Sequence, residues 1–274
     1  MLDRTNVIYC YDGTFNGLMC CVFEAYTAKE LPAEIKSGEP DQMTFLDVKT
    51  IPTVPEKYNR VLASIPKKMG PDAMYFLQTA FLSRDPQKEL HILEFMKTGY
   101  DYGNRVMSMP NEPAFCAVNK MVLHCQKEAQ HLKGFLRFSD NEGALAAVIE
   151  PENCILPMIA EHFTDRYRNE NFLIYDKTHR MALVYSNYVP QLMTDVDFDL
   201  PETTDEEEYY RALWKEFYNS IGIKERFNPR CRMNLMPKRY WSNMPEMRDE
   251  LFKPQNAPRP SDLSSFSNSR KRLH

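Results

Sequence analysis

The stretch from Glu112 to Glu150, EPAFCAVNKMVLHCQKEAQHLKGFLRFSDNEGALAAVIE, joins the two patterns that decide the fold. In its first part, apolar residues recur at alternating spacings of three and four, which is the repeat of one helix face. The pattern predicts a helix over residues 112–133 that ends at Gly134. The apolar positions are Phe115, Val118, Val122, Cys125, Ala129 and Leu132.

Short strand-like runs follow this helix and are separated by turn sequences such as Asp140-Asn141-Glu142-Gly143. Links of hairpin length favour antiparallel neighbours, and a helix near residues 155–168 lies between the second and third runs. The order of elements indicates an α+β protein with a mainly antiparallel sheet packed against several helices. The predicted strands cover residues 135–139, 144–150, 172–176, 181–185 and 188–193.

The chain before residue 112 mixes strand and helix patterns. Residues 6–11 are rich in β-branched and aromatic side chains and predict a strand. Asp12-Gly13-Thr14 then predicts a turn into a buried helix that reaches Tyr26. A second strand is expected at 44–51, and helical patterns follow near residues 56–65, 72–83 and 86–99.

These patterns predict one α+β domain over residues 1–252, followed by a disordered tail at 253–274 that is rich in proline and polar residues. Residues 205–221 predict a helix with an apolar stripe made by Tyr210, Leu213, Trp214, Phe217 and Ile221. The parts of the domain are a helical part (1–133), a sheet-rich part (134–193), an acidic linker (194–208) and a basic helical part (209–252).

The composition excludes several classes of protein. The 274 residues are 43% hydrophobic and 26% charged, as in an ordinary globular chain. No apolar run reaches the roughly 18 residues of a membrane span, and neither a signal peptide nor a glycine-rich nucleotide-binding motif is visible. The seven cysteines form no C-x-x-C pair, which argues against zinc ribbons, redox motifs and iron–sulfur loops. We therefore expect a cytoplasmic protein with reduced thiols, no metal, no cofactor and no membrane contact.

The net charge of −4 hides an uneven distribution of charge. Eight acidic residues and no lysine or arginine occur between Asp195 and Glu208. Nine basic and three acidic residues follow between Arg211 and Arg248, which leaves that segment at +6. An anionic partner is therefore compatible with an overall acidic chain.

The segment from Lys224 to Trp241 combines cations with aromatic rings, which is the chemistry of a nucleic-acid contact. Cations can hold phosphates, and flat rings can stack on single-stranded or flipped bases. The alternative is a solvated basic surface whose rings are core anchors and which pairs with the acidic run. The candidate residues are Arg226, Arg230, Arg232, Lys238 and Arg239 for phosphates, with Tyr240 and Trp241 for bases.

A second candidate contact lies at His131–Phe138. If this segment is a strand, Lys133, Phe135 and Arg137 face the same way and form a cation–aromatic–cation stripe. Packing of Phe135 under a sheet is the alternative.

Acid–base and metal chemistry have weaker candidates. Asp12 precedes a helix that either Asp12 or Thr14 is expected to cap, although Asp12 could act as a general base. His124, Glu128 and His131 share one flank of the predicted helix, but no second Glu-x-x-His motif is present to complete a two-metal site. Asp12 and His131 are the catalytic candidates.

The chain opens with the string Tyr11-Asp12-Gly13-Thr14-Phe15-Asn16-Gly17-Leu18. This string is similar to the Y-D-G-[ST]-F-x-G-L opening of a bacterial family named "probable DNA metabolism protein", whose shared region is a domain of unknown function numbered 4130. The resemblance covers roughly residues 7–247. Further matching strings are His131-x-Lys133-Gly134-Phe135-x-Arg137-Phe138, Ile149-Glu150-Pro151, Leu156-Pro157, His162-Phe163, Tyr210-x-Ala212-Leu213-Trp214 with Phe217, Asn228-Pro229-Arg230 and Met236-Pro237-x-Arg239-Tyr240-Trp241.

The resemblance implies DNA repair or modification beside a radical S-adenosylmethionine protein encoded nearby, and a related domain is fused to uracil-DNA-glycosylase-like domains. It supplies no catalytic residue. This chain lacks the C-x-x-x-C-x-x-C cluster motif, so we do not expect it to be the radical enzyme itself. The leading hypothesis is an accessory DNA-binding protein. The alternatives are a DNA-processing enzyme of glycosylase, lyase or nuclease type and a protein adaptor that does not bind DNA.

Overall fold

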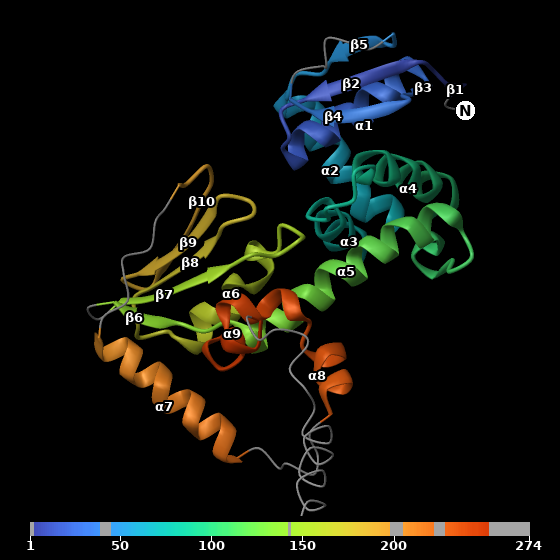
Figure 1. Ribbon diagram of the computed structural model, residues 1–274. Coiled ribbons are helices and arrows are strands. Elements are labelled where there is room, and N and C mark those ends of the chain that lie inside the picture. The colour runs from blue at the N-terminus through green and yellow to red at the C-terminus, as the bar shows by residue number, and fades with distance from the viewer. Residues whose placement is uncertain (1–2, 39–44, 142–143, 198–204, 222–227, 252–274) are drawn as a thin grey trace, which may run out of the picture. The chain divides into compact units, whose positions relative to one another are not determined.

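Two groups of elements make up the computed structural model, which describes residues 3–38, 45–141, 144–197, 205–221 and 228–251 (Figure 1). The N-terminal unit contains the described residues within 1–130 and 151–159. The C-terminal unit contains those within 131–150 and 160–274. The predicted tail, residues 198–204 of the acidic linker and Arg226 lie outside the described residues, and the prediction of one domain over 1–252 stays a prediction.

A parallel sheet opens the N-terminal unit. Strand β2 (Val7–Tyr11) lies between β4 (Glu34–Ser37) and β5 (Asp47–Thr50), and it pairs in parallel with both. A second parallel pair joins β1 (Asp3–Arg4) to β3 (Glu30–Leu31). Parallel neighbours need a crossover, and helix α1 (Phe15–Ala28) supplies it between β2 and β4.

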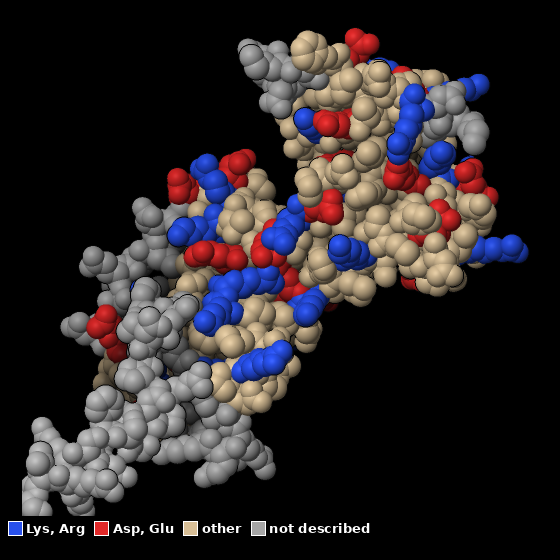
Figure 2. Space-filling model, turned by 45° about the vertical axis from the view of Figure 1, so that its right-hand side comes forward, with Lys and Arg blue, Asp and Glu red and all other residues tan. Residues whose placement is uncertain are grey.

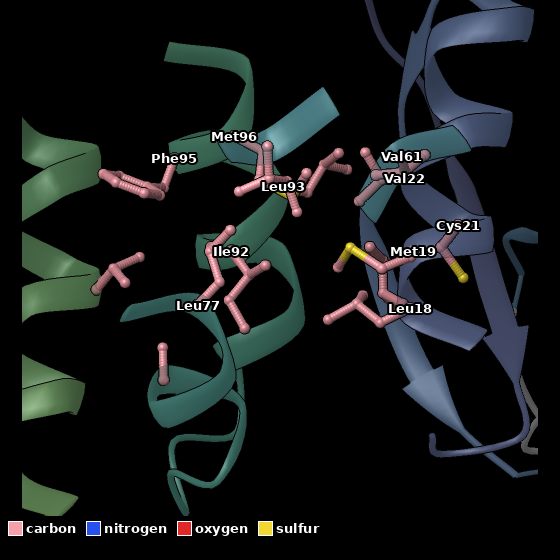
Figure 3. Close-up of a cluster of buried hydrophobic side chains, with 14 of the residues drawn as sticks. Leu18, Met19, Cys21, Val22, Val61, Leu77, Ile92, Leu93, Phe95 and Met96 are labelled. Carbon is pink, nitrogen blue, oxygen red and sulfur yellow. The ribbon is translucent and has the colours of Figure 1, made fainter. Parts of the chain in front are cut away.

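Helices provide most of the N-terminal core. The predicted helices are confirmed as α2 (Pro55–Met69), α3 (Asp72–Phe81) and α4 (Lys88–Tyr102), and the 3-10 helix η1 (Gly103–Ser108) follows. Figure 3 shows the fully buried side chains of α1 and α4 in one apolar cluster that also includes Val61 and Leu77. The labelled members from α1 and α4 are Leu18, Met19, Cys21, Val22, Ile92, Leu93, Phe95 and Met96.

Helix α5 (Pro113–Phe135) extends beyond its predicted end. Gly134 is helical. Of the residues predicted as a strand at 135–139, Phe135 ends this helix, 136–138 form a connection, and only Ser139 belongs to a strand, β6 (Ser139–Asn141). The prediction that Lys133, Phe135 and Arg137 share a strand face is therefore wrong. Glycine weakens a helix by roughly 1 kcal/mol relative to alanine, which a 23-residue helix can tolerate.

The C-terminal unit is built on a five-stranded sheet in the order β10-β9-β8-β7-β6. Helix α6 (Leu156–Arg166) connects β7 to β8, and these two strands are parallel, whereas the other three pairs are antiparallel. The remaining strands are β7 (Ala144–Ile149), β8 (Phe172–Asp176), β9 (Met181–Ser186) and β10 (Val189–Met193).

The α+β class is confirmed, but the expectation of a mainly antiparallel sheet is wrong. Within the described residues, four of the seven strand pairs are parallel. The hairpin links at 177–180 and 187–188 do give antiparallel neighbours. Strands separated by a helix have the length of connection that parallel pairing requires, and this applies to β2/β4 and β7/β8.

Helix α7 (Asp205–Ile221) lies beside the β6 edge of this sheet (Figure 1), and α8 (Pro229–Leu235), η3 (Lys238–Asn243) and α9 (Pro245–Leu251) follow it. The predicted apolar stripe of α7 does not face the core: Tyr210, Leu213, Trp214 and Phe217 are all exposed. Across the described part of the chain, every helix is too short or too polar to cross a membrane.

Candidate nucleic-acid interface

The basic segment folds into two short helical turns whose ends are fixed by the sequence. Asn228 caps α8 by accepting a hydrogen bond from the Cys231 backbone N–H at 3.0 Å, and Pro229 occupies the first helical position. Met236 ends α8, and Pro237 begins the link to η3. This short connection brings the cations of α8 close to those of η3.

Two rings anchor these turns. Tyr240 and Trp241 are only 4% and 3% exposed. The Trp241 indole Nε1–H donates to the Met236 carbonyl oxygen at 3.0 Å, so its polar atom is satisfied within the fold. The Tyr240 ring packs against the rings of Phe135 and His131, with centroids 5.7 and 5.8 Å apart.

The faces of the two rings carry cations of the same segment. The Arg232 guanidinium lies 5.1 Å from the centroid of the Trp241 ring, and the Lys238 Nζ lies 5.8 Å from it. Arg239 lies 4.7 Å from the Tyr240 centroid and also donates to the Tyr240 hydroxyl at 2.6 Å. Cation–π contacts of this kind orient long basic side chains that would otherwise move freely.

This geometry changes the roles predicted for the rings. Tyr240 and Trp241 have little exposed surface on which a base could stack, because they are core anchors covered by basic side chains. Arg230, Lys238 and Arg239 are exposed, and Arg232 is half-buried. Cations therefore provide the surface of this segment, while the aromatic residues hold them in place.

Arg137 forms an internal ion pair. Its Nη2 and Nε donate to Oε1 of Glu246 at 2.8 and 3.2 Å, and its Nη1 donates to the Gly134 carbonyl at 2.9 Å. The Glu246 carboxylate is 1% exposed. Arg137 thus links the end of α5 to α9, and a phosphate would have to compete with a buried carboxylate for it.

Lys133 and Phe135 lie at the end of α5 and are half-buried. Phe135 packs against His131 of α5 and Tyr240 of η3, so its ring is packed within the fold, against helical residues and not under the sheet as the alternative had it. Burial lowers the pKa of His162, and the positive charges of Lys133 and Arg166 lower it further. Lys133 and Arg166 are thus basic neighbours of His162 within the C-terminal unit.

The acidic run pairs with other arginines. Asp197 lies 3.8 Å from Arg180, and Glu207 lies 2.8 Å from Arg211. In the ranges that the structure covers, the ion pairs of this run do not involve the cations of α8 and η3. On the face in view in Figure 2, basic and acidic side chains lie close to one another.

Glu128, the central residue of the possible metal-binding flank, is used structurally. Its buried carboxylate accepts the backbone N–H groups of Glu152 and Asn153 at 3.0 and 2.8 Å, together with the Asn153 side-chain amide. Between residues 3 and 251, leaving aside the undescribed gaps, no group of three or more histidine, cysteine, aspartate or glutamate side chains could hold a metal. The carboxylate that a metal at this flank would need already holds the loop after β7.

Asp12, one of the two catalytic candidates, lies in the N-terminal unit and not in the basic segment. It follows β2 at the carboxyl end of the parallel sheet, and Thr14, rather than Asp12, caps α1 by accepting from the Gly17 N–H at 2.9 Å. Oδ1 of Asp12 accepts the Thr14 N–H and hydroxyl at 2.9 and 2.8 Å, and Oδ2 accepts the Thr53 hydroxyl at 2.7 Å. Partial burial raises the pKa of Asp12, but these hydrogen bonds outweigh it and hold the pKa below its usual value.

Gly17 makes room for this carboxylate. A Cβ at residue 17 would overlap Oδ1 of Asp12 and would lie 2.9 Å from the Thr53 hydroxyl. Sequence reasoning missed Thr53 because it lies 41 residues after Asp12. The Asp12–Gly17 pair, in contrast, is contained in the opening string as the spacing Asp-x-x-x-x-Gly. An exposed, ionised carboxylate at the carboxyl end of parallel strands is a usual position for substrate or ligand contact in such sheets.

The fold and the basic segment define an α+β protein with a surface of cations in its C-terminal unit, held by two buried rings. The chain belongs to the family described as a domain of unknown function (DUF4130), whose model matches residues 86–246. That region contains all the candidate phosphate and base contacts and excludes Asp12. A search of curated proteins finds no match.

Proposed function

We propose that this chain is an accessory DNA-binding protein of a bacterial DNA repair or modification system. The observation that carries the proposal is the set of cations held over two buried rings in α8 and η3. Side chains held in this way lose less entropy when they bind phosphates than free lysines and arginines do. Lys238 and Arg239 are the exposed members of this set, Arg230 is a further exposed cation of α8, and Arg226 precedes them in sequence.

The partner and the location are further parts of the proposal. The resemblance described above supports a radical S-adenosylmethionine protein as the partner, in the cytoplasm. Co-expression of both chains and their co-purification at moderate salt would support a direct contact. Separation of the two at low salt would argue against it.

A charge-reversal experiment tests the DNA-binding proposal. The variant Arg230→Glu/Lys238→Glu/Arg239→Glu should bind any DNA sequence more weakly, and its salt dependence should be flatter by about one unit of log–log slope per lost phosphate contact. Fluorescence anisotropy with single- and double-stranded oligonucleotides measures both quantities.

A matched control separates the site from net charge. Lys67, Lys120 and Lys127 are exposed lysines of the N-terminal unit, and their triple change to glutamate alters the net charge by the same amount. If the control weakens DNA binding as much as the site variant does, the change in net charge, and not the loss of contacts at this segment, is responsible. If the folded site variant binds like the parent at low salt, the DNA role of this segment is wrong and the adaptor function becomes the better account.

Asp12 favours a second candidate function, a DNA-processing enzyme. Its carboxylate is held ionised by Thr14 and Thr53 and is exposed, as a general base needs to be. The other catalytic candidate, His131, is half-buried between Phe135 and Tyr240. Single-turnover assays on damaged oligonucleotides, with Asp12→Asn and His131→Gln as variants, distinguish turnover from binding alone.

A further inference from the structure

Two cations and a histidine lie close together at the ends of α5 and α6 in the C-terminal unit. Lys133 is in the last turn of α5 and Arg166 ends α6, and His162 precedes Arg166 by one helical turn, so that these two side chains share a face of α6. Burial lowers the pKa of His162, and Lys133 and Arg166 lower it further, which places Lys133 beside the same face. We call Lys133, His162 and Arg166 the α5–α6 cluster.

The two cations of this cluster are not neutralised within the fold. In the ranges that the structure describes, neither of them forms an ion pair with a carboxylate, and the neighbouring acid, Asp165, is exposed and pairs with Arg168 at 3.5 Å. Arg166 lies over the Tyr167 ring, 5.9 Å from its centroid, and Lys133 is half-buried. The dipoles of the two helix ends amount to only about half a charge each, so the cluster stays positive.

The imidazole of His162 offers one nitrogen to a ligand. Its Nε2 is buried and has no hydrogen-bond partner among the described residues, and its ring packs edge-on against Phe163 with centroids 5.0 Å apart. A ligand can therefore reach only Nδ1. Protonation of the ring would bury a second N–H without an acceptor, so the neutral ring carries one proton, which Nδ1 can donate.

We propose that the α5–α6 cluster binds a terminal phosphate of a DNA strand, an inference that rests on the proposed DNA-binding function. Two positive charges at one place match a phosphomonoester, which carries about −1.5 to −2 at pH 7, better than an internal phosphodiester with its single charge. The guanidinium of Arg166 can hold two phosphate oxygens at once, Lys133 adds a point charge, and His162 adds a neutral donor.

The end of α5 connects this cluster to the basic segment. Lys133 lies between His131 and Phe135, whose rings both pack against Tyr240 of η3. Arg239 in turn lies over the Tyr240 ring. One helix end therefore supports the cluster and the cations of η3, which favours a single DNA strand as the ligand of both.

Inorganic sulfate tests the cluster without DNA, because it stands in for a terminal phosphate and stays a dianion throughout a pH titration. NMR titration of the full chain should give His162 a higher pKa in sodium sulfate than in sodium chloride of equal ionic strength, because a bound anion offsets the charges of Lys133 and Arg166. The variant Lys133→Met/Arg166→Met should show no such difference. An equal pKa of His162 in the two salts, or an equal rise in parent and variant, would overturn the proposal.

Short single strands that carry a 5′-phosphate, a 3′-phosphate or neither test the ligand. By fluorescence anisotropy, the parent should bind one of the phosphorylated strands roughly tenfold more tightly than the unmodified strand, because charged hydrogen bonds are added. Lys133→Met/Arg166→Met should lose this preference. The control Lys177→Met/Arg180→Met, which removes one exposed lysine and one exposed arginine from the turn between β8 and β9, should keep it.

The outcomes separate this inference from the proposed function. Equal binding of phosphorylated and unmodified strands by the parent overturns the inference and leaves the DNA-binding proposal intact. A preference that survives in the cluster variant, or that the control loses as well, also overturns it. If the parent binds none of the strands, both proposals are wrong. Circular dichroism establishes that each variant is folded.

Discussion

At the residue scale, the lack of a side chain at Gly17 leaves the space that the Asp12 carboxylate occupies. The carboxylate of Asp12 lies where a methyl group at residue 17 would be. Gly134, by contrast, lies in α5 with open space around its Cα. The two glycines therefore predict opposite effects for the same substitution.

We expect Gly17→Ala to destabilise the protein by about 1–3 kcal/mol, because the added methyl must displace Asp12 or Thr53. Gly134→Ala should be neutral or should stabilise by up to about 1 kcal/mol, because alanine is the better helix former. Urea denaturation measures both. Equal effects of the two substitutions would mean that the space at Gly17 is not limiting.

The charge environment of His162 gives a second residue-scale prediction. Its pKa is lowered by burial and by the positive charges of Lys133 and Arg166, and raised by Asp165. Lys133→Met should therefore raise the pKa of His162, and Asp165→Asn should lower it further. NMR titration of the imidazole Cε1 proton measures each shift.

The sign of the stability effect follows from the same shift. A histidine whose folded pKa lies below its unfolded value binds fewer protons when folded, so its contribution to stability falls as pH decreases below about 6.5. His162→Gln should reduce the acid sensitivity in that range. If the parent and this variant lose stability equally between pH 7 and pH 5, His162 is not a source of the sensitivity.

At the element scale, the end of α5 depends on an ion pair with α9. Glu246→Gln should cost about 1–3 kcal/mol, because it weakens charged hydrogen bonds to Arg137 at a buried position. Arg4→Ala, which removes the exposed pair with Glu94, should cost less than about 1 kcal/mol. Thermal unfolding of both variants makes the comparison, and similar losses would contradict a special role for Glu246.

The helices could be predicted closely from sequence, since periodic apolar positions such as Val118, Val122 and Cys125 all face the core. Residues 135–139 could not, because their aromatic content suits a strand while the helix before them continues through Gly134. In α7 the helix and its apolar stripe could be predicted, but the exposure of the stripe could not, since periodicity identifies an apolar face and not what covers it. Nor could the site at Asp12 be completed, because Thr53 comes from another strand end.

At the scale of the whole molecule, the reactivity of the seven cysteines reports which parts of the chain are buried and which are exposed. Cys116 and Cys231 are exposed, Cys154 is half-buried, and the other four are buried. Burial raises the pKa of Cys125 to about 12 and also raises that of Cys21. Thiolates, not thiols, react with disulfide reagents, so the two exposed cysteines should react first.

We expect Ellman's reagent to modify two thiols rapidly in the native chain, with a slower third, and all seven in denaturant. The variant Cys116→Ser/Cys231→Ser should lose the rapid phase. Rapid reaction of four or more native thiols would contradict the cores described here.

The close approach of Asp12 and Gly17 also constrains how the sequence can change over generations. A larger residue at 17 is most costly while the carboxylate is present and less costly once residue 12 has lost it, so the two substitutions are not independent. The Thr53 hydroxyl and the Tyr11 ring, each 2.9 Å from the added Cβ, still limit the space. The order of accepted changes therefore favours a change at position 12 before one at 17. Lineages that keep the aspartate are held to glycine five residues later, whatever the protein binds.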